Sequence, residues 1–149
     1  MKTKAIFILF LFFVTNLSFS NTIFSVQLAK AEAFKKEQKF TKAINCYLKA
    51  IRSVQNDDAM VKEVYFDIAD CFYKSGKVNM AVKVLKFSIY RFGAVKQDLL
   101  DTNKLDDQLV HSLFEVIGDK YDSYRNKYVS KFDKKEKLLA EVASETKTS

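Results

Sequence analysis

Apolar side chains recur along residues 65–89 with the spacing of two short α-helices. The two sets are Tyr65, Ile68, Ala69 and Phe72, and then Val78, Ala81, Val82, Leu85 and Ile89. Steps of three and four residues place each set on one face of a helix. Ser75 and Gly76 lie between the sets, and glycine readily adopts the left-handed conformation that often ends a helix. The pattern predicts a helical hairpin whose two apolar faces meet.

The same arrangement occurs 38 residues earlier in the chain. The residues in register with the hairpin above are Ala31, Phe34, Phe40, Ala43, Tyr47, Ala50 and Ile51. The turn of this first hairpin is expected near Gln38 and Lys39, where the sequence has no glycine. Because one hairpin cannot bury its own apolar faces, two copies in one register predict units that stack on each other.

The two copies resemble the tetratricopeptide repeat, a helical hairpin of about 34 residues with the pattern W-x2-L-G-x2-Y followed by A-x3-F. The second copy contains Tyr65-x2-Ile68-Ala69-x2-Phe72 and Ala81-x3-Leu85, and the first contains Ala31-x2-Phe34 and Ala43-x3-Tyr47. The closing proline of the family is missing, with Gln55 and Gly93 in its place. The resemblance covers residues 24–93 and implies an all-α fold in which two hairpins, within residues 21–93, form a short solenoid.

The repeat length exceeds that of the family by four residues, which fit in the polar linker Gln55–Asp58. Asp57 or Asp58 is expected to cap the helix that follows, since a carboxylate there accepts hydrogen bonds from the first backbone N–H groups.

A further apolar stripe begins at Leu105 and advances in steps of four, with one step of three. Its members are Leu105, Leu109, Leu113, Ile117, Tyr121, Tyr124, Tyr128 and Phe132. This spacing predicts one continuous C-terminal helix. We interpret residues 94–140 as a degenerate third repeat or a capping helix, because the last unit of a stack otherwise exposes an apolar face. Residues 94–107 form a short helix or a loop, and residues 141–149 are predicted to be a disordered tail.

Residues 1–20 have the composition of a secretory signal peptide. Lys2 and Lys4 precede an apolar run over residues 5–14, and Ser18-Phe19-Ser20 supplies the small residues of a cleavage site. The apolar run is shorter than the roughly 20 residues that span a bilayer. Cleavage predicts a secreted or periplasmic protein, and membrane contact is expected only if the leader is retained.

The composition agrees with an all-α fold. Three glycines and no proline argue against turn-rich sandwiches and barrels. The formal net charge is +7, or +5 without Lys2 and Lys4, which favours mild attraction to anionic surfaces. No nucleic-acid-binding motif accompanies this charge, so nucleic acid is not an expected partner.

No pattern in the sequence predicts catalysis. The chain has no glycine-rich phosphate loop, zinc-ligand spacing or nucleophile turn, and its one histidine, His111, has no ligands at metal-binding spacing. The carboxylates expected on helix surfaces are Asp67, Asp70, Asp106, Asp107 and Glu115. We therefore expect a non-enzymatic protein without a cofactor, a metal ion or a small-molecule substrate.

Cys46 and Cys71 lie on helices that the repeat arrangement makes neighbours. An exported protein could join them in a disulfide. The alternative is that both are small buried residues in helix contacts.

The family resemblance implies a concave groove lined by the first helix of each repeat. Carried over by position, the partner-binding residues are Leu28, Glu32, Lys35, Lys36, Glu63, Phe66, Asp70, Tyr73 and Lys74. Phe66 and Tyr73 are expected to be exposed aromatic anchors, with the lysines setting a charge preference. The alternative is that the C-terminal helix covers this face.

These features predict a non-enzymatic adaptor that binds another protein or a peptide in the cell envelope, within an assembly or secretion apparatus. The alternative is a membrane-anchored structural protein whose basic surface contacts anionic lipid.

Overall fold

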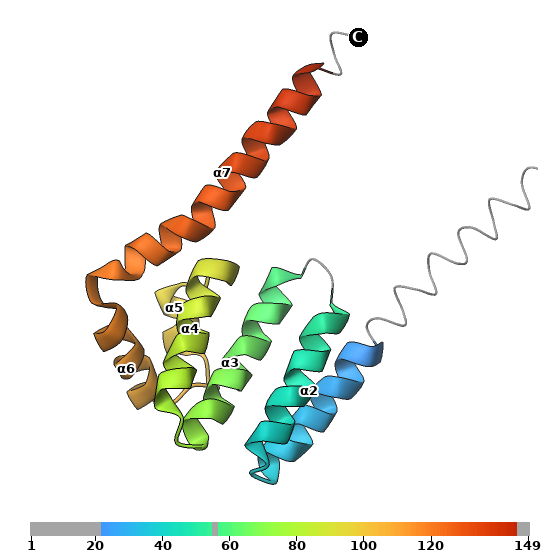
Figure 1. The fold of residues 1–149 in the computed structure, drawn as a ribbon, viewed down its shortest axis with the longest axis vertical. Coiled ribbons are helices and arrows are strands. Elements are labelled where there is room, and N and C mark those ends of the chain that lie inside the picture. The colour runs from blue at the N-terminus through green and yellow to red at the C-terminus, as the bar shows by residue number, and fades with distance from the viewer. Residues whose placement is uncertain (1–21, 55–56, 146–149) are drawn as a thin grey trace, which may run out of the picture. The chain divides into compact units, whose positions relative to one another are not determined.

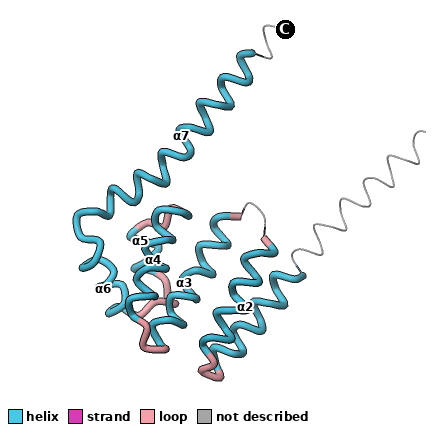
Figure 2. The backbone as a smooth tube through the Cα atoms, in the orientation of Figure 1, coloured by secondary structure: helices cyan, strands magenta, loops and turns pink. Residues whose placement is uncertain are grey.

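A computed structural model describes residues 22–54 and 57–145, with side chains up to residue 134. Every regular element in these ranges is a helix (Figures 1 and 2), which confirms the predicted all-α fold. The predicted signal peptide, residues 1–20, lies outside the described residues, as do residues 146–149 of the predicted tail. The chain forms two compact units, Met1–Val64 and Tyr65–Ser149.

The first unit contains a helical hairpin made of a helix over residues 22–36 and α2 (Phe40–Ser53), which lie side by side in Figure 1. Its fully buried side chains are Ala31, Ala43, Tyr47 and Ala50. Three of the four are alanines, and small residues allow two helices to approach closely. The Tyr47 hydroxyl donates a hydrogen bond to Oε1 of Glu32 and so joins the two helices.

The turn of this hairpin is formed without glycine, as predicted. Gln38 adopts a left-handed conformation with φ of 58°. Its N–H donates to the Lys35 carbonyl at 3.0 Å, and the N–H of Lys39 donates to the Phe34 carbonyl at 2.8 Å. These bonds satisfy two of the carbonyl groups that the end of a helix leaves without helical partners.

The second hairpin consists of α3 (Asp58–Lys74) and α4 (Val78–Phe92). Asp57 precedes α3, and its side chain accepts a hydrogen bond from the Met60 N–H at 2.9 Å, which confirms the predicted cap. The unit boundary falls within α3, between Val64 and Tyr65.

The turn between α3 and α4 repeats the first turn 38 residues later. Gly76 is left-handed with φ of 78°. Its N–H donates to the Tyr73 carbonyl at 2.8 Å, and the N–H of Lys77 donates to the Phe72 carbonyl at 2.9 Å. Each partner lies 38 positions after its counterpart in the first turn, so the two hairpins share one register at their turns.

The core of the second unit is built from α3, α4 and the two elements that follow. Its fully buried members include Phe66, Ala69, Ala81, Leu85, Ile89, Leu99, Leu109 and Leu113. Leu99 belongs to α5 (Lys96–Asp101), a short helix in the segment for which the sequence left both helix and loop open. Leu109 and Leu113 belong to α6 (Asp107–Ile117), which is capped by the Asp106 carboxylate through the Gln108 N–H at 2.9 Å.

The prediction of one continuous C-terminal helix is wrong. Helix α6 ends at Ile117, because Gly118 leaves the helical region with φ of 42° and ψ of −127°. A short 3-10 helix over Gly118–Lys120 follows, and α7 begins at Tyr121.

Helix α7 (Tyr121–Glu145) packs its first turns against α4. The Tyr128 ring lies against Gly93, the left-handed residue with φ of 71° that ends α4, and Arg125 donates a hydrogen bond to the Gly93 carbonyl. The helix continues five residues past position 140, so residues 141–145 are helical and not the start of a disordered tail.

Candidate functional site

The nine residues predicted to bind a partner are divided between the two units. In the first unit, Lys36 and Glu63 are exposed, and three more residues are partly exposed: Leu28, Glu32 and Lys35. In the second unit, Lys74 is exposed and Tyr73 is partly exposed, whereas Phe66 and Asp70 are buried. Whether the two sets line one groove stays a prediction.

The prediction that Phe66 is an exposed anchor is wrong. Its side chain is 0% exposed and belongs to the same core cluster as Leu109 and Leu113 of α6. Leu109 and Leu113 belong to the stripe that begins at Leu105, so the first part of the predicted C-terminal helix shares the core with Phe66. This agrees with the alternative that the C-terminal segment buries this face, because apolar surfaces are removed from water together.

Tyr73 is tied to the start of α6. Its hydroxyl lies 3.2 Å from Oδ1 of Asp106 and 3.3 Å from Oε1 of Gln108, so these two acceptors share its one O–H donor. The Asp106 carboxylate thus caps α6 and also accepts a hydrogen bond from Tyr73 of α3. Burial and the nearby Asp106 carboxylate raise the pKa of the Tyr73 hydroxyl. Tyr73 is consequently a docking residue for α6 and presents only part of its ring to solvent.

Two carboxylates expected on helix surfaces are buried. Asp67 is 4% exposed and accepts from Nζ of Lys104 at 2.8 Å, and Asp70 is 2% exposed and accepts from Nζ of Lys74 at 2.9 Å. A buried carboxylate is tolerated when a cation and hydrogen bonds compensate for its lost hydration. Lys74, predicted to set charge preference for a partner, is therefore engaged within its own helix.

Cys46 and Cys71 are both buried thiols. Cys46 belongs to the first unit and Cys71 to the second. The disulfide between them stays a prediction.

The second unit contains a pocket that the sequence did not indicate. It has a volume of about 390 Å³ and lies among α5, α6 and the start of α7. Its lining residues are Lys96, Leu100, Phe114, Gly118 and Tyr121. The pocket depends on the break at Gly118, because only a turn there brings Tyr121 back towards α5. Sequence reasoning missed it by treating residues 105–132 as one helix.

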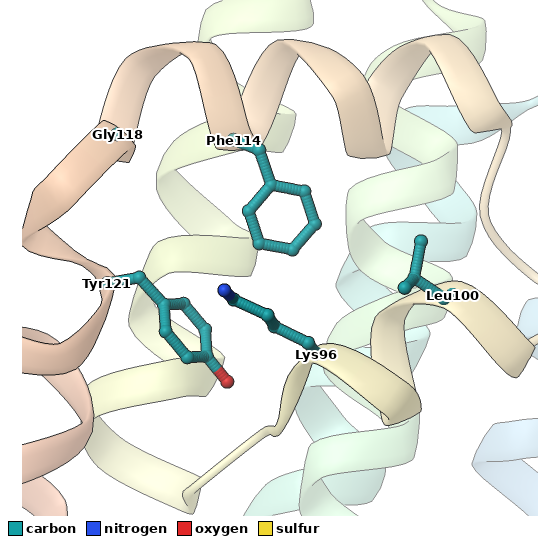
Figure 3. A pocket seen from close by; sticks show the side chains of 5 residues that line it. All are labelled: Lys96, Leu100, Phe114, Gly118 and Tyr121. Atoms are coloured by element: carbon teal, nitrogen blue, oxygen red, sulfur yellow. The ribbon is translucent and has the colours of Figure 1, made fainter.

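The walls of the pocket are apolar and one cation lies inside it. Figure 3 shows the Lys96 side chain reaching between the rings of Phe114 and Tyr121, with Nζ 4.8 Å from the Tyr121 ring centroid. A cation over an aromatic face is attracted by the electron density of the ring. Burial raises the pKa of the Tyr121 hydroxyl, so at neutral pH this phenol is neutral.

This arrangement can bind a side chain of a partner. Leu100 is 62% exposed at the pocket mouth, which leaves an apolar contact open to a partner. Small pockets in proteins have volumes of about 300 Å³ and upwards, are mostly apolar, and use a few polar groups to fix orientation. The Lys96 ammonium would favour a partner group with negative charge beside an apolar side chain.

In the described part of the chain, no cluster of three or more His, Cys, Asp or Glu residues could hold a metal ion. Nδ1 of His111 lies 3.7 Å from Oε1 of Glu115, and both side chains are exposed. Across residues 22–54 and 57–145, none of the helices has the length and apolar character needed to cross a membrane.

Comparison of the chain with protein-family models, with curated proteins and with solved structures gave no match.

Proposed function

We propose that this chain is a non-enzymatic, tetratricopeptide-like adaptor that binds another protein or a peptide in the cell envelope. Two hairpins with the same turn geometry and the same spacing of buried small residues support the repeat assignment. Repeats of this kind serve as scaffolds that present a surface to a partner.

The observation on which the proposal depends is the aromatic pocket of the second unit. Phe114 and Tyr121 form rigid walls, Leu100 exposes its side chain at the mouth, and Lys96 provides the charge. Binding energy at protein interfaces concentrates where an anchor side chain fills such a pocket and excludes water. We infer that one large apolar side chain of the partner, next to an acidic residue, enters it. The contact site thus differs from the groove implied by the family resemblance.

The chain provides a matched pair of variants for a test. Leu100 lines the pocket and is 62% exposed, whereas Val116 on α6 is 64% exposed and does not line it. Both tolerate a polar replacement because neither belongs to the core. Leu100→Asp places a like charge where an acidic partner residue would sit, and Val116→Asp adds the same charge elsewhere.

Photo-crosslinking in cells would identify the partner. A photoreactive amino acid is placed at position 100 in one variant and at position 116 in another, and the crosslinked protein is identified. We expect a partner captured from position 100 and not from position 116. Binding of that partner to purified Leu100→Asp should weaken about 10- to 100-fold, the effect of losing one buried apolar anchor, while Val116→Asp retains it. Identical products from both positions, or equal affinities of both variants, would remove the pocket from the proposal.

A further inference from the structure

We propose that α7 binds the α7 of a second copy of this chain in the antiparallel direction, through a surface that shares no residue with the pocket. The contacts of α7 with α4 extend from Tyr124 to Lys131. The Tyr124 and Tyr90 ring centroids lie 6.5 Å apart, and Nζ of Lys131 donates to the Tyr90 carbonyl at 3.3 Å. The helix then continues over residues 132–145, a length of about 21 Å.

The apolar stripe of α7 also continues past Lys131. The Phe132 ring lies edge-on to the Tyr128 ring with centroids 4.9 Å apart. Phe132 is 45% exposed, and Val129, three positions earlier and on the same side of the helix, is 43% exposed. In the sequence, Leu139 follows Phe132 after seven residues, which is the spacing of two helical turns. Such a stripe favours a second helix as its cover, because packing removes it from water.

The charges along α7 differ between its middle and its end. The basic stretch, residues 125–137, contains six basic and two acidic residues: Arg125, Lys127, Lys131, Lys134, Lys135 and Lys137, with Asp133 and Glu136. The acidic end, residues 138–145 with the sequence LLAEVASE, contains Glu141 and Glu145 and neither lysine nor arginine. Two copies of α7 in opposite directions therefore place the acidic end of each on the basic stretch of the other, where opposite charges attract.

One chain cannot bring its own acidic end to its own basic stretch, because α7 is one continuous helix. Helix α4, against which α7 packs, contains no acidic residue. The other acidic residues of the second unit up to the basic stretch are Asp67, Asp70, Asp98, Asp101, Asp106, Asp107, Glu115, Asp119 and Asp122. Among the described side chains, none of them forms an ion pair with a base of the stretch. The complementary charge is thus available from a second molecule.

The acidic end selects a second copy over other occupants of this face. An anionic membrane or a nucleic acid would attract the basic stretch but repel Glu141 and Glu145, which lie among apolar residues in the sequence. A second copy supplies both an apolar stripe and the opposite order of charges. In a two-fold arrangement each favourable contact also occurs twice.

The test is sedimentation equilibrium of the full chain over a range of protein and salt concentrations. We expect a monomer–dimer equilibrium below about 100 µM that salt weakens, because exposed charges are screened. In the variant Glu141→Lys with Glu145→Lys, like charges meet at both ends of the dimer, so its dissociation constant should rise at least about tenfold. The control variant Asp101→Lys with Glu115→Lys reverses the same number of exposed charges elsewhere in the unit and should leave it unchanged.

The reciprocal variant, Lys127→Glu with Lys131→Glu, should also dimerise more weakly. An equimolar mixture of it with the Glu141→Lys and Glu145→Lys variant should recover the dimer, because opposite charges then meet again across the antiparallel pair. Every protein compared carries the same leader, so differences among them report on the substitutions.

The apolar contribution is tested separately. Phe132→Ser should raise the dissociation constant about 10- to 100-fold, whereas Met80→Ser, at a residue of α4 that is 42% exposed, should not change it. A chain that stays monomeric at about 100 µM in low salt, equal losses in the acidic-end variant and its control, or no recovery on mixing would overturn the proposal.

Discussion

The two hairpins have the same turn and the same buried small residues, but the outer faces of their first helices differ. Ala31 and Ala69 are both fully buried, as are Ala43 and Ala81. One turn of helix before Ala31, Leu28 is partly exposed, whereas its counterpart Phe66 is fully buried. The spacing of small residues therefore determines how the two helices of a hairpin pack on each other. A segment far along the chain determines whether the outer face of the first helix is available to a partner.

The largest expected difference between the hairpins concerns this outer face. Phe66→Ala should lower the free energy of unfolding by about 3–5 kcal/mol, since it empties a packed core position. Leu28→Ala, at the equivalent position, should cost less than about 2 kcal/mol, because its side chain is already partly in water. Urea denaturation of the full chain, followed by circular dichroism, measures both. Losses of equal size would mean that the two faces are equally covered.

The next largest effect is a difference in stability between alanine variants of Gly93 and Gly76, the two left-handed glycines of the second hairpin. An alanine at position 93 would be strained at positive φ and would also place its Cβ within the Tyr128 ring, whereas position 76 has no atom within 4 Å of an added Cβ. Gly93→Ala should therefore cost about 2–4 kcal/mol, and Gly76→Ala about 1 kcal/mol.

The double variant Gly93→Ala with Tyr128→Ala provides the control for this contact. If the steric conflict is real, the two changes together should cost less than the sum of their separate effects. Strict additivity, measured by the same urea denaturation, would show that Tyr128 does not press on Gly93.

A smaller effect tests the shared turn. Gln38 occupies the left-handed position that glycine fills in the second hairpin. Gln38→Gly should raise the free energy of unfolding by about 0.5–1 kcal/mol, because glycine adopts this conformation without the steric cost of a side chain. Gln38→Ala keeps that cost and serves as the control. A thermal melt in which both variants behave alike would argue against a strained turn in the first hairpin.

The smallest effect is a pH dependence at Tyr65 of the second hairpin. Burial raises the pKa of the Tyr65 hydroxyl, which the Arg91 charge partly offsets; the residue 38 positions earlier, Gln27, does not titrate. The unfolded tyrosine loses its proton first as pH rises through about 10, so the stabilising contribution of the neutral phenol is complete below that pH and declines above it. The free energy of unfolding of wild type should therefore fall more steeply than that of Tyr65→Phe above about pH 10. Parallel curves would contradict this.

Much of the two hairpins between residues 22 and 93 could be predicted from the sequence because the evidence is local. Helix spacing, the break at Gly76 and the Asp57 cap each depend on a few neighbouring residues. The candidate site could not be predicted in the same way. Its pocket exists because Gly118 interrupts an apolar stripe. The stripe keeps helical spacing on both sides of Gly118, so spacing alone does not reveal that the chain turns there.

By itself, the sequence determined that this chain is helical, where its hairpins turn and which small residues they bury, since periodicity and glycine chemistry act over one or two helical turns. The tertiary structure alone decided that Phe66 joins a core with Leu109 and Leu113 of α6, that Asp67 and Asp70 are buried with lysine partners, and that residues from α5 to the start of α7 line a pocket. These outcomes depend on contacts between apolar faces that are dozens of residues apart in the sequence. Burial is favourable against any apolar surface of suitable shape, so the apolar pattern of one helix does not specify which helix packs against it.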